Sequence, residues 1–489
     1  MPYTVHSESD RKRMLEAIGA SSTDDLFVQI PAELRKAPLR LPPGLSEQET
    51  RTRTDALAAA DRPPGPACFL GAGYYRHFVP AAVRALVSRS EFATAYTPYQ
   101  PEVSQGTLEH IFEFQTCICE ITGMDVANAS LYDGPSALAE GAFMALRATR
   151  RNEIAVSAGV HPEARLVLAT YASGPPIPLH VLPLQAGSGA TAMPDQGELP
   201  SGVGAVLVQQ PNHLGVIEDL EPLAAAAHAS GALLVVSVNP ATLGVLESPG
   251  ALGADIVVGD AQVFGCPPSF GGPSVGFLAC QKDHMRQIPG RLVSQTVDED
   301  GRLCYTLTLQ AREQHIRRAR ATSNICSNQA LSALAATIHL ALLGPTGLRD
   351  RGEICLRRAH FLRSRLCALA GVRPLVDGPF FNEFALRLPC RAEDFALVMR
   401  ARGVDPGVPL VRLWRGQPVE LDGGAVEAPV EEALLVAVTE LNPPEALAMY
   451  VEAAASILAS LGAARGGGAA RASAPGGAAP DVARPGEGS

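Results

Sequence analysis

Residues 94–115 form the part of the chain richest in side chains that could bind a substrate. The candidate residues are Tyr96, Pro98, Tyr99, Gln100 and Glu102. Proline fixes the backbone dihedral φ, so Pro98 and Pro101 stiffen this loop and hold its hydrogen-bonding groups in place. Tyrosine joins an apolar ring to a polar hydroxyl, which suits a substrate pocket and a subunit contact equally. From the residues alone, both roles stay open.

The stretch Gly253–Cys280 is notable for a residue type that it lacks. Its β-branched runs and its Gly/Pro-rich crossing at residues 265–273 predict two strands. In one large class of cofactor enzymes, a strand and turn of this kind carries the lysine that binds pyridoxal phosphate as a Schiff base. No lysine lies between Asp255 and Cys280. The whole chain has only three lysines: Lys12, Lys36 and Lys282.

The cysteines and histidines do not predict a metal site. None of the ten cysteines belongs to a C-x-x-C pair. His110 and Glu113 share one face of an expected helix, but no second ligand pair accompanies them. We interpret both as packed or exposed polar residues.

A glycine-rich turn, Gly71-Ala72-Gly73, precedes an expected helix at Pro80–Ser88. Such a short glycine pattern is weak evidence for phosphate binding. The preferred interpretation is a tight turn that brings Tyr74, Tyr75 and His77 to an interface.

From Gly123 onward, short apolar runs alternate with helical or loop segments. The start of one helix is Tyr132–Ser136, and this helix is expected to continue to about Arg151. The expected strands are Ile154–Val156, Leu166–Ala169, Ala205–Val208, Leu233–Val238, Ile256–Val258 and Val275–Ala279. This succession predicts an α/β domain with a mainly parallel sheet. Ligands of such sheets bind at the carboxyl ends of the strands.

Beyond this region, Gln310–Arg320 is expected to be a charged helix. Its arginines, Arg317, Arg318 and Arg320, look like a nucleic-acid patch, but neighbouring Glu313 and the acidic chain favour a solvated or interface face. An apolar helix at Gln329–Leu343 should end at Gly344-Pro345.

The chain divides into four expected parts. Residues 1–66 are a helical arm with too few large apolar residues for a core, and residues 67–346 are the large α/β domain. Residues 347–462 form a smaller α/β domain with strands at Phe384–Leu388 and Leu434–Val438. Residues 463–489 are rich in Ala, Gly and Pro and should be disordered.

Composition narrows the class of function. The net charge of −10 argues against a nucleic-acid partner, which requires a basic face. No apolar run was expected to reach membrane-spanning length, and the polar N-terminus lacks the apolar core of a secretory signal. We therefore expect a cytoplasmic protein with no membrane partner.

Five blocks of sequence together resemble a known family. They are Ala93–Gln105, Tyr132–Glu140, Gln209–Gly215, Asp255–Phe277 and Ala311–Gln329. In order and spacing they are similar to subunit 1, the α subunit, of the glycine decarboxylase P-protein of the glycine cleavage system, over about residues 3–461. The resemblance implies a fold-type-I, aspartate aminotransferase-like architecture with a large parallel-sheet domain and a smaller C-terminal α/β domain.

The resemblance also implies a reaction and its partners. The partner chain is a β subunit (subunit 2) in an α₂β₂ assembly, and the reaction converts glycine and the lipoyl arm of H-protein to carbon dioxide and an aminomethylated arm. Pyridoxal phosphate is the electron sink for this decarboxylation. The resemblance places the Tyr96–Glu102 loop near the partner's cofactor, so we expect Tyr96, Tyr99 and Gln100 to shape the glycine pocket or the lipoyl entrance.

The cofactor anchors of the related β chain are missing at the matching positions. The lysine position falls at about Val263 and the position of the ring carboxylate at Asn239, so neither an imine nor a charged contact with the ring nitrogen is available. We expect the partner subunit to hold pyridoxal phosphate, with none bound covalently here. The start of the helix at Gly134-Pro135-Ser136 is expected to be a cap rather than a phosphate site.

Two other functions are open. One is a self-sufficient pyridoxal-phosphate enzyme that uses Lys282. The other is a catalytically silent scaffold that stabilises its partner.

Overall fold

The computed structural model describes residues 5–35, 41–61, 65–174, 176–193, 199–414, 420–421, 424–425 and 430–467. The chain forms two compact units, Met1–Pro64 and Gly65–Ser489. Most of the tail expected to be disordered, residues 468–489, lies outside the described residues.

The first unit is helical and has no core among its described residues. Its elements are α1 (Glu8–Ala17), η1 (Thr23–Phe27), η2 (Ala32–Leu34) and α2 (Glu47–Ala60). Ser7 and Ser46 begin the two α-helices with capping boxes, in which each serine accepts from a backbone N–H and the third helical residue bonds back. No described side chain of this unit is buried. Its helices are therefore stabilised locally rather than by packing.

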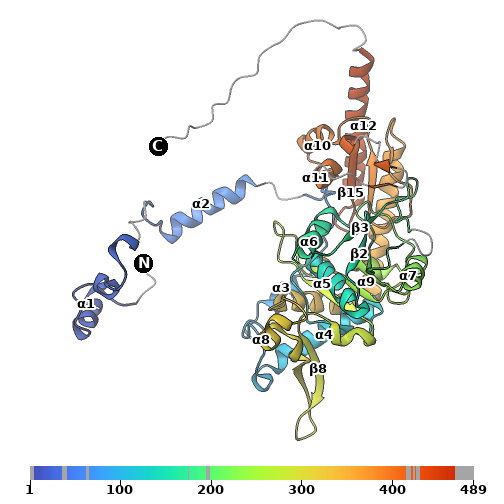
Figure 1. Ribbon diagram of the computed structural model, residues 1–489. Helices are drawn as coiled ribbons and strands as arrows, with labels where there is room; N and C mark the ends of the chain where they lie inside the picture. The colour runs from blue at the N-terminus through green and yellow to red at the C-terminus, as the bar shows by residue number, and fades with distance from the viewer. Residues whose placement is uncertain are drawn as a thin grey trace. The chain divides into compact units, whose positions relative to one another are not determined.

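The second unit is built on a seven-stranded sheet (Figure 1). The strands are β1 (Val126–Ala127), β2 (Glu153–Ser157), β3 (Leu179–Leu182), β4 (Val203–Gln210), β5 (Leu233–Val238), β6 (Ile256–Asp260) and β7 (Gly276–Cys280). Their order is β1-β7-β6-β5-β4-β2-β3. The strands from β3 to β6 are parallel, and β7 is antiparallel to both β6 and β1. The predicted mainly parallel sheet is confirmed.

Helices cover both faces of this sheet. One face packs on α5 (Gly134–Thr149) and α6 (Pro162–Ala172). The other packs on α3 (Ala81–Val87), α4 (Gln105–Thr122), α7 (Leu220–Ala229) and the first half of α9 (Ala330–Cys367). Alternate residues of one strand pack into opposite layers. Ala205 and Leu207 belong to the core layer with α5, whereas Val206 and Val208 belong to the layer with α4 and α7. Burial on both faces explains the continuous apolar runs of the strands.

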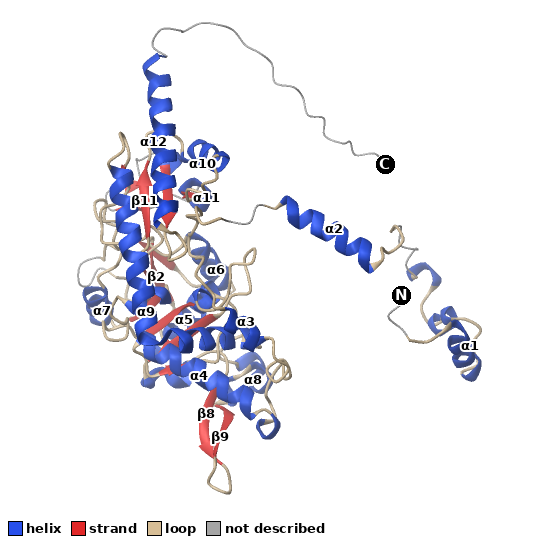
Figure 2. Ribbon diagram, turned by 180° about the vertical axis from the view of Figure 1, so that it is seen from behind, coloured by secondary structure: helices blue, strands red, loops and turns tan. Residues whose placement is uncertain are grey.

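Three predictions about elements in this region were wrong or incomplete. Leu166–Ala169 lies inside α6 and not in a strand, because a short apolar run fits a helix and a strand equally. The strand β3 and the hairpin of β8 (Leu292–Val297) and β9 (Leu303–Thr308) were missed; Figure 2 shows this hairpin projecting beside α4.

The expected charged helix at 310–320 is three short pieces. They are η7 (Gln310–Arg312), α8 (Gln314–Arg317) and η8 (Arg318–Arg320). Arg318 adopts a left-handed φ of 53°, which ends the helical path because side chains with a Cβ rarely continue a helix there.

The long helix α9 is broken at the predicted position. Gly344 has φ 58° and ψ −178°, and Pro345 follows it. Gly344 leaves the helical region of φ and ψ, so the first helix ends there as predicted. A second helix follows from Pro345, whose missing N–H is tolerated in a first turn.

By length and composition alone α9 could cross a membrane, contrary to the expectation that no run was long enough. Core helices of soluble proteins pass the same test. Its residues Ala333, Ala336 and Leu340 are buried in the core beside the sheet.

A second, four-stranded sheet follows α9. Its order is β10 (Arg373–Pro374), β11 (Glu383–Arg387), β15 (Ala433–Ala437) and β12 (Val408–Pro409). It packs with the second half of α9, α10 (Ala392–Ala401) and α12 (Pro444–Gly467), while α11 (Leu410–Trp414) and the short pair β13 (Glu420–Leu421) and β14 (Gly424–Ala425) complete this part. The two strands predicted here, now β11 and β15, are confirmed to within one residue.

Candidate functional site

A cavity of about 550 Å³ lies at the carboxyl edge of the large sheet. Its lining comes from the ends of β4, β5 and β6, the first turn of α5 and two loops, and includes Gln209, Asn239, Asp260, Val263, Gly134, Tyr74 and His161. This edge is where open α/β sheets bind ligands. The positions singled out as missing anchors, Asn239 and Val263, therefore meet the start of α5 in one cavity.

Lys282 lies at the other edge of the sheet. Because β7 is antiparallel to β6, its last residue, Cys280, pairs with Ile256 at the beginning of β6. Lys282 is exposed, and its backbone N–H donates to Asp125 over 2.9 Å. The topology thus argues against an imine on Lys282 inside the cavity.

Asn239 is a backbone cap. Its Oδ1 accepts from the N–H of Ala241 over 3.1 Å, at the start of η4 (Pro240–Gly244). The amide carries no charge to offer a ring nitrogen. Val263, in η5 (Ala261–Val263), is buried and offers only methyl groups.

The start of α5 is capped by carboxylates of the chain itself. Asp133 Oδ1 accepts from the N–H of Ser136 over 2.8 Å, and Asp260 Oδ2 accepts from the N–H of Gly134 over 3.2 Å. Pro135 has no N–H to give. The predicted cap at this position is confirmed in its geometry.

Asp260 is a buried carboxylate with several donors. Its Oδ1 also accepts from the N–H groups of Gln262 and Val275, at 2.9 and 3.0 Å. Burial raises the pKa of Asp260, and these backbone hydrogen bonds oppose that rise.

These residues do not fit pyridoxal phosphate as a covalent cofactor of this chain. Among the described residues, the cavity has no amine for the aldehyde, and position 239 carries an amide in place of a carboxylate. Its helix start is bonded to Asp133 and Asp260. The cavity lies where a cofactor site would be, but it lacks the lysine and the carboxylate that would hold the cofactor.

His161 is a cavity residue that sequence reasoning missed. Its backbone N–H donates to Gln209 Oε1 over 2.9 Å, while its ring Nε2 has no partner among the described residues. Burial lowers the pKa of its imidazole, so the ring is neutral at physiological pH. Only the fold, which brings this loop to the sheet edge, reveals the position.

The glycine turn before α3 joins the cavity to the second sheet. Glu383 of β11 accepts from the N–H of Ala72 over 2.7 Å and from the hydroxyl of Tyr75 over 2.8 Å. A Cβ at Gly71 would lie 2.3 Å from Glu383 Oε1, so only glycine fits. The interface expected for Tyr75 and His77 is found within the chain, since His77 bonds Glu440 beyond β15 over 2.8 Å.

The Tyr96–Glu102 loop lies outside the cavity, on the surface. Tyr96 is 80% exposed and Tyr99 is 54% exposed. Gln100 and Glu102 are also exposed, whereas Pro98 is buried and anchors the loop. The prediction that this loop contacts a substrate or a partner stays a prediction.

Arg291 connects this loop to the motif at residues 311–329. Its guanidinium lies 5.6 Å from the centre of the Tyr99 ring and is almost fully buried. It donates to the carbonyl of Cys326 over 2.8 Å and to Ser327 and Asn328 over 3.3 Å. A guanidinium cation and the face of an aromatic ring attract each other. Arg291 therefore holds the ring of Tyr99 in place.

Two further residues complete this contact. The rings of Tyr99 and His315 are 5.8 Å apart and meet edge to face. The carboxylate of Glu313 lies 4.0 Å from Arg291 Nε and 3.6 Å from His315 Nδ1. Arg291 follows an unremarkable loop in the sequence, so no sequence signal could have identified it.

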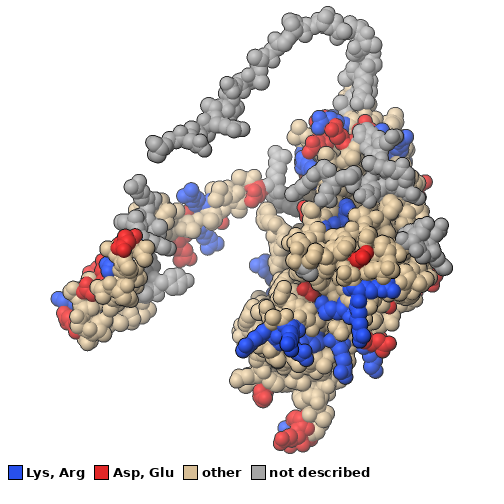
Figure 3. Space-filling model, in the orientation of Figure 1, with Lys and Arg blue, Asp and Glu red and all other residues tan. Residues whose placement is uncertain are grey.

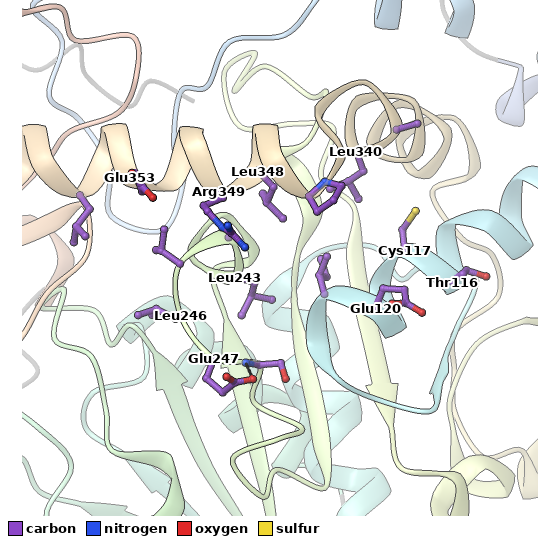
Figure 4. A pocket seen from close by; sticks show the side chains of 18 of the residues that line it. Thr116, Cys117, Glu120, Leu243, Leu246, Glu247, Leu340, Leu348, Arg349 and Glu353 are labelled. Carbon is purple, nitrogen blue, oxygen red and sulfur yellow. Dashed lines mark hydrogen bonds between the residues drawn. The ribbon is translucent and has the colours of Figure 1, made fainter.

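A larger groove of about 1160 Å³ lies between α4, η4 and the bend in α9 (Figure 4). Leucines such as Leu243, Leu340 and Leu348 line it. The charged residues of its lining are Glu120, Glu247, Arg349, Glu353 and Arg357. None of the candidate residues from the sequence lies in this groove. It combines an apolar floor with charged side chains at several places.

Comparisons with known proteins identify the family. A profile of the "Glycine cleavage system P-protein" family matches residues 1–407. The chain is 48% identical over 459 residues to a "Probable glycine dehydrogenase (decarboxylating) subunit 1" of Nitratidesulfovibrio vulgaris, covering 94% of this chain and all of that one. It is 51% identical over 389 residues to the protein of the same name from Desulforamulus reducens, covering 79% and 87% of the two chains.

Solved structures agree with this assignment. The crystal structure of a glycine decarboxylase (P-protein) of the glycine cleavage system, in inhibitor-bound form, has a TM-score of 0.85 and 48% identity, covering 94% of this chain and all of that one. A sphingosine-1-phosphate lyase from Burkholderia pseudomallei has a TM-score of 0.60 at 14% identity, which supports the fold-type-I architecture alone. The chain belongs to the glycine cleavage system P-protein family, in the group of its subunit 1 relatives.

Proposed function

We propose that this chain is the subunit of glycine dehydrogenase (decarboxylating) that does not carry the cofactor. Together with a lysine-bearing β subunit, it decarboxylates glycine and transfers the aminomethyl group to the lipoyl arm of H-protein. Full-length relatives named as subunit 1 support the enzyme. The observation that supports a cofactor held by the partner subunit is the cavity, where Val263 and Asn239 lie at the expected anchor positions.

In this proposal the partner subunit holds pyridoxal phosphate, which supplies the electron sink for loss of the carboxylate. The assembly is α₂β₂, in the cytoplasm, without a membrane or nucleic-acid partner. The acidic net charge of −10 supports the last point.

The contribution of this chain to the reaction comes from the Tyr96–Glu102 loop. The exposed hydroxyls of Tyr96 and Tyr99 and the amide of Gln100 are available to donate or accept hydrogen bonds across a subunit contact. Arg291 and His315 fix the ring of Tyr99, so its hydroxyl is positioned before a ligand arrives. A positioned donor binds a substrate with less loss of side-chain entropy.

The experiment is a reconstitution of the two subunits. Exchange of labelled carbon dioxide into the glycine carboxylate is measured with lipoylated H-protein, for each purified subunit and for their mixture. Exchange is expected only from the mixture. Exchange catalysed by this chain alone would overturn the proposal.

The scaffold alternative makes a different prediction for the same mixture. If this chain only stabilises its partner, changes in the Tyr96–Glu102 loop leave turnover unchanged in the assembled complex. No feature of the described residues favours this alternative.

A further inference from the structure

Arginines gather on one face of the second unit, although the chain as a whole is acidic. Figure 3 shows this concentration of basic side chains over α8 and α5. We call it the arginine face. It consists of exposed Arg286, Arg317, Arg318 and Arg320 and the more buried Arg147 and Arg312.

Hydrogen bonds make these residues neighbours in space. Arg147 of α5 donates to the carbonyl of Gln287 at the end of η6 (Lys282–Gln287) over 3.2 Å. Arg312 of η7 donates to the carbonyl of Gly290 over 3.2 Å. Three elements from distant parts of the sequence therefore present one basic surface.

The exposed arginines of this face have no paired carboxylate within the described residues. None of its four exposed arginines forms an ion pair there, whereas Arg387, Arg400 and Arg412 on the smaller sheet domain each pair with a carboxylate. Glu313, which adjoins the face, lies within 4.0 Å of Arg291 and His315.

The two inner arginines carry an electrostatic cost. Burial lowers the pKa of Arg147, and the charge of Arg312 lowers it further, against the opposing effect of Glu140. The Nε of Arg147 is buried without a hydrogen-bond partner. Like charges held together in this way are stabilised when an external anion approaches them.

The face adjoins the Tyr96–Glu102 loop. His315 in α8 contacts the ring of Tyr99, and Arg317 and Arg318 follow within three residues. Ile316, in the same helix, is 51% exposed, and Val103, directly after the Tyr96–Glu102 loop, is 79% exposed. Arginine, tyrosine and aliphatic side chains together are typical of protein interfaces.

We propose that the arginine face docks an acidic surface of a second protein, which delivers its reacting group beside the Tyr96–Glu102 loop. That the second protein is the lipoylated carrier rests on the proposed function. The chemistry of its docking surface, rich in Asp and Glu, follows from the unpaired arginines. Opposite charge on the two surfaces speeds encounter and sets the orientation of docking.

The test compares two charge-matched variants of this chain in the assembled complex. Arg318→Glu/Arg320→Glu reverses two charges on the face. Arg365→Glu/Arg373→Glu reverses two exposed arginines elsewhere that have no ion pair among the described residues. Each variant is assayed with lipoylated H-protein and with free lipoamide, at several salt concentrations, and assembly is measured by size-exclusion chromatography.

The first variant is expected to lower kcat/KM for H-protein roughly tenfold at low salt, and less at high salt. Its activity with lipoamide and its assembly should match the control variant. Equal losses with both acceptors, loss of assembly, or an unchanged KM for H-protein would each overturn the inference. Binding of RNA by the wild-type chain that the first variant abolishes would also overturn it.

If the complex lacks glycine decarboxylation altogether, the proposed function fails. The docking inference is then still decided by direct binding of H-protein to the two variants in an optical biosensor. Weaker binding by the first variant alone supports docking, and equal binding contradicts it.

Discussion

The cavity at the sheet edge and the surface around Tyr99 differ in how their polar groups are used. In the cavity, Asn239, Asp133 and Asp260 accept backbone N–H groups of the chain itself. On the surface, Tyr96 and Tyr99 are exposed, and the exposed Arg317, Arg318 and Arg320 form no ion pair among the described residues. These three cavity groups have little left for a ligand, although the ring Nε2 of His161 has no partner among the described residues. The comparison therefore directs function toward the surface.

The largest effect is expected on stability, from removing the buried Arg291 beneath the ring of Tyr99. Arg291→Met leaves Glu313 and the carbonyl of Cys326 without their buried cation. Removing one member of such a buried charged network costs about 3–5 kcal/mol. Urea unfolding should show this loss of stability, whereas Arg365→Met, at an exposed position, should change stability by under about 0.5 kcal/mol.

A loss of stability near that of the control would mean that Arg291 does not organise the loop. Arg291→Lys keeps the charge but not the planar fork, so it should recover only part of the stability.

The contact of Glu383 with the glycine turn should make the stability of the chain depend on pH. Burial raises the pKa of Glu383 to about 7, while its bonds from Ala72 and Tyr75 oppose the rise. In the unfolded chain its pKa is 4.5, so the native state binds the proton more tightly. The stability from this group is complete below about pH 4.5 and is lost as pH rises through 7, by about 3 kcal/mol.

Glu383→Gln removes this titration and keeps a carbonyl for the N–H of Ala72. The free energies of unfolding of wild type and variant should therefore diverge between pH 5 and pH 8, with wild type declining relative to the variant. Parallel curves would show that Glu383 does not titrate in this range.

The hydroxyls on the surface should matter for turnover. In the assembled complex, Tyr96→Phe/Tyr99→Phe is expected to lower decarboxylation about tenfold to hundredfold, because each lost hydrogen bond to a charged group costs about 1.5 kcal/mol or more. Assembly should be unchanged, since the rings remain. Wild-type kinetics in this variant would remove the loop from the reaction.

The smallest effect is expected in the cavity. Asn239→Ala removes the cap of η4 and should cost about 1 kcal/mol of stability. Turnover of the complex should stay within about twofold of wild type. A loss of turnover comparable to that of the tyrosine variant would show that the cavity contributes to turnover as much as the surface loop does.

Much of the fold could be predicted from the sequence because the local signals agreed. The apolar runs of β4, β5 and β6 and the Gly344-Pro345 break in α9 were read correctly. Leu166–Ala169 was misassigned because four apolar residues have no distinctive period. The hairpin of β8 and β9 was missed because the polar β8 depends on α4, where Gln115 bonds Val293 in both directions.

The residues of the candidate site also include some that the sequence revealed and some that it did not. The missing anchors at Val263 and Asn239 were visible through the resemblance to the family, whose β chain places a lysine and a carboxylate at these positions. The contacts of Tyr99 with Arg291 and His315 were not, since they join segments about 200 residues apart. Sequence periodicity carries no information about such pairs.

The division of function between the two subunits is tested most directly by finding which of them holds pyridoxal phosphate. The reconstituted complex, loaded with pyridoxal phosphate, is reduced with borohydride, digested and analysed by mass spectrometry. We expect a pyridoxyl group on a lysine of the partner subunit, with Lys12, Lys36 and Lys282 of this chain unmodified. A stoichiometric pyridoxyl group on Lys282 would contradict this expectation.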